Sequence, residues 1–197
     1  MEYEKTIWDT FRYGDELSFR KLFEEYYGPL FNYGHKFTTD SFVIEEALQD
    51  LFVKLWNNKS NIRETGSVKN YLYKAFRRVL LRKLDYSPRL HLFSNANAAD
   101  NAPFNIQLGH DDAMIRDENH QETRQKLETA LSKLSPRQRE IIHLRYFEEL
   151  DYEEIAVIMQ LSISSAYKLL YRAIDALKIQ FTPLEWIAVM YVLALKK

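Results

Sequence analysis

The fold of this chain is decided by residues 131–178, LSKLSPRQREIIHLRYFEELDYEEIAVIMQLSISSAYKLLYRAIDALK. Ser135 begins a helix, because a proline follows it in the first turn and Gln138 supplies a capping-box partner. Asp151 and Glu154 form a second helix start of the same kind. Apolar residues recur at helical spacing after each start. The stretch therefore predicts three successive helices, the last two of them joined by a tight turn.

The last two helices have the spacing of a helix-turn-helix, which places its second helix in the major groove of DNA. Lys168 and Arg172 are four residues apart, so they share one face of that second helix. The candidates for contact with DNA are Ser164, Ser165, Tyr167, Lys168, Tyr171 and Arg172. Spacing alone leaves an ordinary helical hairpin with solvated charges as the alternative.

The motifs of this stretch also carry a resemblance to a known family. LSPRQRE, YEEIA and the late Arg-Ala pair resemble the C-terminal domain of bacterial RNA polymerase sigma factors of the extracytoplasmic-function (ECF) group, in the sigma-70 family. The resemblance implies that this domain reads the minus-thirty-five promoter element. The chain departs from the family pattern at Gln160, where a turn glycine is common. It departs again at Tyr167 and Leu169, where basic residues are frequent.

A basic block lies upstream of this domain. Residues 59–93 hold nine Lys or Arg against two Asp or Glu, whereas residues 1–58 and 94–123 are acidic. A helix expected at 68–84 carries much of the block and also several aromatic side chains. Basic groups bind phosphate and aromatic rings stack on unpaired bases, so the combination suits opening DNA. A solvated helix face is the alternative, and it is the usual meaning of a charge run.

Residues 43–56 and 68–84, VIEEALQDLFVKLW and VKNYLYKAFRRVLLRKL, resemble the sigma-factor domain that binds RNA polymerase and opens promoter DNA. The resemblance implies that the first helix docks on the largest catalytic subunit through Asp50, Phe52, Val53 and Trp56. It implies that the second helix and the loop before it handle the minus-ten element. The residues assigned to that element are Lys69, Tyr73, Lys74, Phe76, Arg77 and Arg78. The residues expected to face the core instead are Tyr71, Leu72, Ala75, Val79 and Leu80.

Few glycines, prolines and β-branched runs favour an all-α fold with two small helical domains. We assign residues 1–86 to sigma domain 2, which binds core polymerase and the minus-ten element. Residues 87–117, without sustained periodicity, are expected to be a flexible linker. Residues 118–180 form sigma domain 4 with its helix-turn-helix, and residues 181–197 form an apolar C-terminal helix.

That last helix, LEWIAVMYVLAL, is apolar on all sides. It is too short to cross a bilayer, which takes about 20 apolar residues, and it lacks the polar face of a membrane-surface helix. A helix of this kind is expected to be buried. It can be covered by the chain's own domains, by a second copy in a homo-oligomer, or by a partner such as an anti-sigma factor.

No pattern in the sequence supports catalysis. The five histidines are scattered, and there is neither a glycine-rich phosphate loop nor a nucleophile motif. We therefore expect no enzyme, no cofactor, no metal site and no small-molecule substrate. The absence of cysteine and of a secretory apolar segment suits a cytoplasmic protein. The expected partners are core RNA polymerase, promoter DNA and an anti-sigma factor.

Two other functions stay open at this point. A helix-turn-helix transcriptional regulator that acts without polymerase binding would bind duplex DNA tightly as an isolated chain. A sigma-fold interaction or adaptor protein would recognise no promoter at all. A sigma factor would bind DNA weakly alone and support transcription only with core polymerase.

Overall fold

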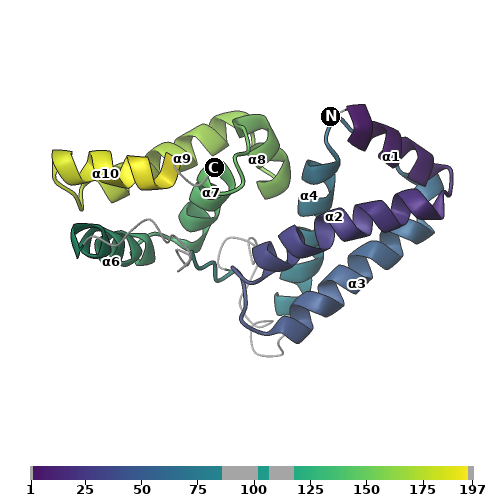
Figure 1. Cartoon of the computed structure of the whole chain (residues 1–197), viewed down its shortest axis with the longest axis horizontal. Helices are drawn as coiled ribbons and strands as arrows, with labels where there is room; N and C mark the ends of the chain where they lie inside the picture. The colour runs from purple at the N-terminus through teal and green to yellow at the C-terminus, as the bar shows by residue number, and fades with distance from the viewer. Residues whose placement is uncertain (1, 86–101, 107–117, 195–197) are drawn as a thin grey trace. The chain divides into compact units, whose positions relative to one another are not determined.

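The computed structural model describes residues 2–85, 102–106 and 118–194. Within these ranges the regular elements are all helices, and the chain divides into two compact units between Ala102 and Pro103 (Figure 1). The prediction of an all-α fold with two helical domains is confirmed. Most of the expected linker, residues 87–101 and 107–117, lies outside the described residues.

The described residues of the N-terminal unit form four α-helices and one short 3-10 helix. They are α1 (Glu2–Arg12), α2 (Glu16–Gly34), α3 (Ser41–Asn57), η1 (Lys59–Asn61) and α4 (Val68–Asp85). Asp15 and Asp40 cap α2 and α3, and each carboxylate accepts hydrogen bonds from backbone N–H groups of the first turn. The Ser67 hydroxyl accepts from the Asn70 N–H at 3.2 Å and so starts α4 as expected. Helix α4 packs on both α3 and α2.

An aromatic cluster forms the centre of this unit. Tyr33 of α2 lies 5.2 Å from Tyr73 and 6.4 Å from Phe76, measured between ring centroids. Gly34, next to Tyr33, lets the helices approach closely. A Cβ atom at Gly34 would lie 2.7 Å from a methyl group of Ile44 and 3.1 Å from the Phe76 ring. Only glycine therefore fits between α3 and α4 at this point.

The orientation of α4 differs from the one that its sequence predicts. Tyr73 and Phe76 are fully buried and Arg77 nearly so, although all three were expected to face outward. The physical reason is that α4 packs against α3 and α2 and also contacts α1, so its buried stripe is wider than the single face assumed. Leu72, Val79 and Leu80 are buried as expected, whereas Tyr71 and Ala75 are only half-buried.

The C-terminal unit also consists of helices. They are α6 (Glu118–Ser132), α7 (Pro136–Tyr146), α8 (Tyr152–Met159), α9 (Ile163–Lys178) and α10 (Pro183–Ala194). Both expected capping boxes are present. The Ser135 hydroxyl accepts from the Gln138 N–H at 3.3 Å, and the Gln138 side chain accepts from the Ser135 N–H at 2.9 Å. Asp151 and Glu154 pair in the same way at 2.8 and 2.9 Å.

A short segment that was assigned to the linker belongs to this unit. Phe104 is buried, and its ring centroid lies 5.6 Å from that of His143 on α7. The Arg139 guanidinium donates a hydrogen bond to the Asn105 side-chain oxygen at 3.0 Å, and Ile106 is buried as well. Residues 103–106 are therefore held against α7 by apolar burial and a polar contact.

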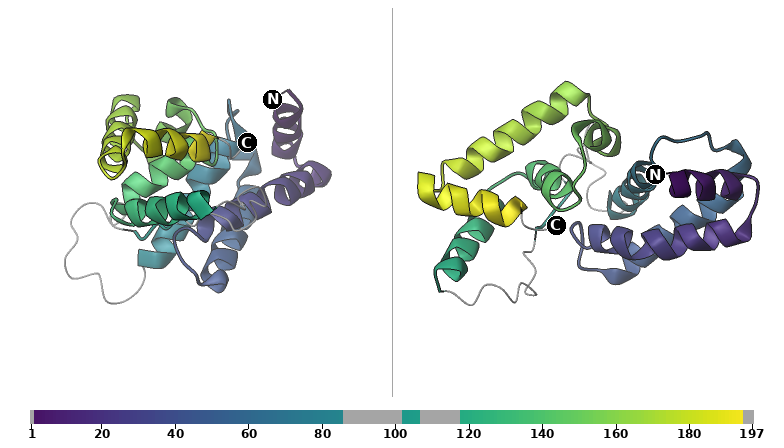
Figure 2. Two further views of the ribbon diagram at one scale, coloured as in Figure 1. Left: turned by 60° about the vertical axis from the view of Figure 1, so that its left-hand side comes forward. Right: turned by 45° about the horizontal axis from the view of Figure 1, so that its top comes forward.

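Over residues 183–190, where side chains are described, the apolar C-terminal helix docks on its own unit along one side. After α9 the chain turns back and α10 lies beside α6 (Figure 2). Val189 is fully buried, and the Lys126 ammonium of α6 pairs with the Glu185 carboxylate. Leu184 and Ile187 remain 80% and 66% exposed in the single chain, so the chain's own domains do not cover these two residues, and their burial by a second copy or a partner stays a prediction. No described helix is both long and apolar enough to span a membrane.

We expect Val189→Ala to destabilise the C-terminal unit by about 2 kcal/mol, because it removes two methyl groups from a filled position. The control is Leu184→Ala on the solvent side of the same helix, with an expected change within about 0.5 kcal/mol. Urea titrations followed by hydrogen exchange of the α6 amides measure both values. Equal effects of the two substitutions would contradict the one-sided docking of α10.

We also expect the contact between α10 and α6 to weaken in acid. Hydrogen bonds from Lys126 and from the backbone and hydroxyl of Thr182 lower the pKa of Glu185 to about 2. A carboxylate with a depressed pKa contributes its full stabilisation above the ordinary value of about 4.5 and loses it as pH falls toward 2. Hydrogen exchange of α10 should therefore accelerate over that window. Glu185→Gln should remove this pH dependence, and an unchanged profile in the variant would contradict the assignment.

Candidate nucleic-acid interface

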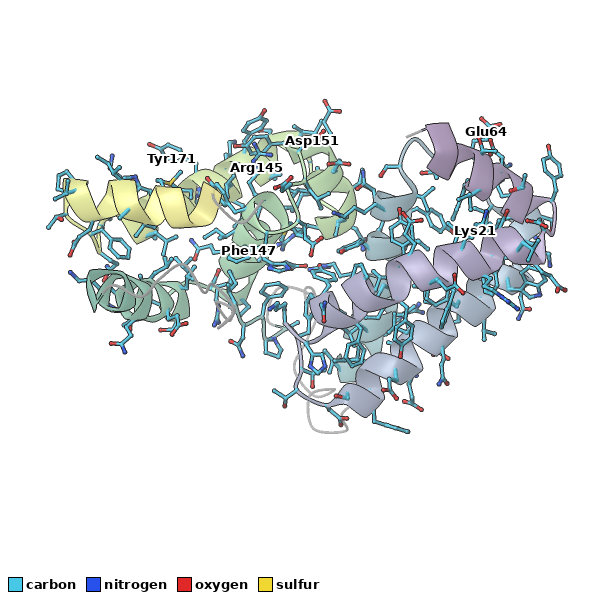
Figure 3. All side chains as sticks on the ribbon, in the orientation of Figure 1. Lys21, Glu64, Arg145, Phe147, Asp151 and Tyr171 are labelled. Carbon is cyan, nitrogen blue, oxygen red and sulfur yellow. The ribbon has the colours of Figure 1, made fainter. Side chains whose placement is uncertain are left out.

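All six candidate residues of α9 lie on its solvent side. Ala166, Leu170, Ala173 and Leu177 bury the opposite side of the helix. Tyr167 is 51% exposed and Tyr171, marked in Figure 3, is 74% exposed. Ser164, Ser165, Lys168 and Arg172 are exposed as well. The structure thus gathers the residues expected at the minus-thirty-five element on one face, and their contact with DNA stays a prediction.

The turn between α8 and α9 depends on a left-handed residue. Gln160 ends α8 with φ 55° and ψ 50°, and its N–H donates to the Ala156 carbonyl. The Leu161 N–H donates to the same carbonyl at 2.9 Å. The Ser162 hydroxyl then caps α9 by accepting from the Ser165 N–H at 3.1 Å. Gln160 occupies the position where the family commonly has glycine, and the left-handed backbone explains that preference.

A stack of side chains supports the exposed Tyr167, and sequence reasoning missed it. The Tyr152 ring at the start of α8 lies 3.6 Å from the Tyr167 ring with an interplanar angle of 20°. The Arg145 guanidinium lies 5.5 Å from the Tyr152 ring and donates to the Leu150 carbonyl at 2.8 Å. Cation–π and aromatic contacts of this kind favour one orientation of the outer ring. No local spacing signals the stack, because its members come from three different helices.

The N-terminal unit carries a basic pocket of about 530 Å³ between α3, η1 and α4. Its basic residues are Lys54, Arg63, Arg78 and Arg82. Its apolar residues are Leu51, Leu55, Ile62, Ala75 and Val79, with Tyr71 beside them. Partial burial raises the pKa of Tyr71, so its hydroxyl stays protonated and can donate a hydrogen bond. Arg63, Arg78 and Arg82 belong to the basic block of the sequence, Lys54 lies outside it, and only the fold brings Lys54 and Arg63 together with α4.

The structure reduces the set of residues that can contact the minus-ten element. Arg78 lines it, Lys74 is exposed nearby on α4, and Lys69 is half-buried with its ammonium 5.5 Å from the Tyr73 ring. Tyr73, Phe76 and Arg77 are inside the unit, so they cannot stack on bases or bind phosphate in this structure. The prediction stays for Lys69, Lys74 and Arg78.

The surface expected to bind polymerase lies on α3. Val53 is 57% exposed, and Trp56 is half-buried with the Lys59 ammonium 4.0 Å above its ring. Phe52, which was expected to contact polymerase, is buried with its ring 4.8 Å from that of Phe23, and its contact with a partner stays a prediction. Phe52 packs α3 against α2.

Asp50, the remaining member of that set, is tied to α4. Its carboxylate lies 3.1 Å from the Lys83 ammonium, which is also 3.5 Å from Glu46. Partial burial opposes the charge on Lys83, but the hydrogen bonds and charges of Asp50 and Glu46 outweigh it and raise the pKa of Lys83. Lys83 therefore stays protonated and joins the two helices.

Family models match both units of the chain. The model of sigma-70 region 2 matches residues 22–87, and the model of sigma-70 region 4 matches residues 124–177. RNA polymerase sigma factor YlaC of Bacillus subtilis is 26% identical over 167 residues, covering 84% of this chain and 92% of that protein. RNA polymerase sigma-H factor of Pseudomonas aeruginosa is 24% identical over 189 residues, covering 93% and 96%.

A solved structure shares the fold. CnrH, in complex with the cytosolic domain of CnrY, matches with a TM-score of 0.60 and 14% identity, covering 89% of this chain and 95% of that one. Two helical units, matched by the models of sigma-70 regions 2 and 4, define a transcription initiation protein. The chain belongs to the sigma-70 family of RNA polymerase sigma factors, in the ECF group. Members of this family are initiation factors rather than enzymes.

We expect Gln160→Gly to stabilise the C-terminal unit by about 0.5–1 kcal/mol. The left-handed backbone costs a residue with a side chain about 1–2 kcal/mol, of which glycine's larger loss of chain entropy cancels part. Gln160→Ala keeps the strain and should give no gain. Urea midpoints of the three proteins measure this, and a gain from alanine equal to that from glycine would show that backbone strain is not the cause.

Proposed function

We propose that this chain binds core RNA polymerase and directs it to promoters, with its N-terminal unit at the minus-ten element and its C-terminal unit at the minus-thirty-five element. The observation that carries the proposal is that each unit matched by a sigma-70 model presents its own exposed basic surface. The proposal implies a cytoplasmic location, where polymerase works.

At the minus-thirty-five element, α9 lies in the major groove. Lys168 and Arg172 reach backbone phosphate or guanine edges, and a good bidentate contact discriminates between bases by about 1–3 kcal/mol. Tyr167, held by Tyr152, presents a ring edge and a hydroxyl. Ser164 and Ser165 stand at the first turn of α9, where recognition helices place their base contacts.

At the minus-ten element, the basic pocket takes an unpaired base of the opened strand. Its apolar wall covers the face of the base, and the Tyr71 hydroxyl offers a hydrogen bond to an edge. Arg63, Arg78 and Arg82 at the rim attract the flanking phosphates. A volume of about 530 Å³ lies within the range of small-molecule sites, so a nucleobase fits.

The polymerase contact consists of Val53 with the half-exposed Asp50 and Trp56. These three residues come from the last turns of α3, so they form one continuous apolar and acidic surface. An anti-sigma factor is a second proposed partner, because the solved relative CnrH is in complex with the cytosolic domain of CnrY. Self-association through α10 stays a prediction, and its exposed Leu184 and Ile187 are the residues available for it.

Run-off transcription separates this function from the alternatives. The chain should support transcription only with core polymerase, and it should bind duplex DNA weakly alone. Tight binding to duplex without polymerase would indicate a plain helix-turn-helix regulator. Binding to polymerase without any promoter-dependent product would indicate an adaptor.

We expect Val53→Glu to reduce recovery of core polymerase in a pull-down at least tenfold, because it places a charge in the apolar centre of the proposed contact. Val53 is exposed, so circular dichroism should remain helical. The control is Tyr13→Glu in the turn between α1 and α2, where the side chain is 92% exposed. Unchanged recovery by the Val53 variant would place the polymerase contact elsewhere.

We expect Lys74→Ala and Arg78→Ala each to reduce the salt dependence of holoenzyme binding to promoter DNA by about 0.9 in the log–log slope, if each loses one phosphate contact. Lys21→Ala on α2, labelled in Figure 3, removes an exposed charge outside the pocket and should leave the slope unchanged. Slopes from filter binding between 50 and 200 mM salt are a suitable readout. Equal slopes for all four proteins would mean that the α4 charges are only solvated.

A further inference from the structure

The loop between η1 and α4 forms one wall of the basic pocket. Asn61, Ile62 and Arg63 all line the pocket, and residues 62–65 have no regular secondary structure. Ile62 is extended, with φ −77° and ψ 128°. A loop without its own hydrogen-bond ladder needs outside contacts to hold its side chains in place. Those contacts come from α1, which precedes the residues matched by the region 2 model.

Two side chains of α1 donate hydrogen bonds to successive carbonyls of this loop. The Arg12 Nε donates to the Ile62 carbonyl at 2.6 Å, across 50 residues of sequence. The Trp8 Nε1 donates to the Arg63 carbonyl at 3.4 Å, across 55 residues. Arg12 also lies 4.0 Å from the carboxylate of Glu64, which Figure 3 shows beside α1.

Both donors are themselves held in place. Asp9, one turn before Arg12, lies 3.3 Å from the Arg12 guanidinium and fixes its direction. Trp8 is fully buried, and its ring meets that of Tyr71 edge-on at 5.0 Å. Tyr71 lines the same pocket from α4. Helix α1 therefore contacts the pocket wall twice, through the loop backbone and through the Tyr71 ring.

We propose that Arg12 and Trp8 are positioning residues for the unpaired base, which they never touch. By binding the carbonyls of Ile62 and Arg63 they fix the loop backbone, and this fixes where those two side chains stand in the pocket. The inference rests on the proposed function of the pocket as a base site. It adds that the choice between bases there depends on a helix outside the pocket.

A positioning role and a merely structural role predict different results. Loss of the hydrogen bonds should leave the charge of the pocket rim intact, so attraction to phosphate should persist. The shape of the pocket should vary, so the preferred base should lose its advantage over the other three. A general loss of stability would instead lower binding to all four bases by the same factor.

The test uses Arg12→Met, which keeps the apolar stem, and Trp8→Phe, which keeps a ring in the core. Arg12→Lys is the conservative variant, because an ammonium can still donate to the Ile62 carbonyl. Glu64→Gln is the control, because it changes only the long ion pair. Each protein is bound to core polymerase and assayed for open complexes on promoters that carry each base in turn at the minus-ten positions.

We expect the ratio of the best to the worst base at one minus-ten position to fall at least fivefold in Arg12→Met and in Trp8→Phe. Arg12→Lys should recover part of the ratio, and Glu64→Gln should keep all of it. An unchanged ratio in both variants, or an equal loss for all bases, would overturn the inference. Absence of promoter activity from the unsubstituted chain with core polymerase would instead overturn the proposed function.

A second measurement does not depend on DNA or polymerase. The Ile62 amide donates to the Lys59 carbonyl at 3.3 Å, so its hydrogen exchange reports the order of the loop. In the free protein we expect its exchange to accelerate at least tenfold in Trp8→Phe, while amides in the middle of α3 stay protected. If Arg12→Met fails to fold, this result decides alone, and unchanged exchange at Ile62 would overturn the inference.

Discussion

The absence of a side chain at Gly34 is the constraint on which the N-terminal unit depends. A Cβ atom at this position would lie 2.7 Å from a methyl group of Ile44, so any other residue would force the Ile44 side chain to shift. Because α2 and α3 meet this closely, α4 lies against both and buries Tyr73, Phe76 and Arg77. In this orientation of α4, Lys74 and Arg78 face the solvent. The position of the basic pocket is therefore a consequence of helix packing in the core.

The parts that sequence predicted well are those fixed by local chemistry. Ser135 with Gln138 and Asp151 with Glu154 set the starts of α7 and α8, and each cap needs only residues three apart. Apolar residues recur at helical spacing along one side of α9, and this places Lys168 and Arg172 on the opposite, outward side. Gln160 stands where the family commonly has glycine, and its left-handed backbone explains why glycine is preferred at that position.

The parts that sequence could not predict depend on contacts between distant segments. The sequence predicts a single buried face for helix α4, but the periodicity of a helix does not reveal how many other helices pack against it. Residues 103–106 lack periodicity, yet Phe104 is buried on α7 because that helix offers an apolar surface. The hydrogen bonds from Arg12 and Trp8 to the loop before α4 join residues 50 and 55 positions apart. In each case a long-range contact decides where the residue lies.

Both proposed surfaces of the N-terminal unit are built on one packed core, and this links them mechanically. Asp50 of the polymerase surface pairs with Lys83 of α4, the helix that also carries Lys74 and Arg78. Close-packed interiors transmit strain, so a displacement of α3 by a partner would be felt at α4. Lys83 also lies 3.5 Å from Glu46, and together with Lys54 and Arg82 it lines a second hollow between α3 and α4. Under the proposed function, the Asp50–Lys83 pair therefore joins the helix that meets polymerase to the helix whose charges meet the DNA strand.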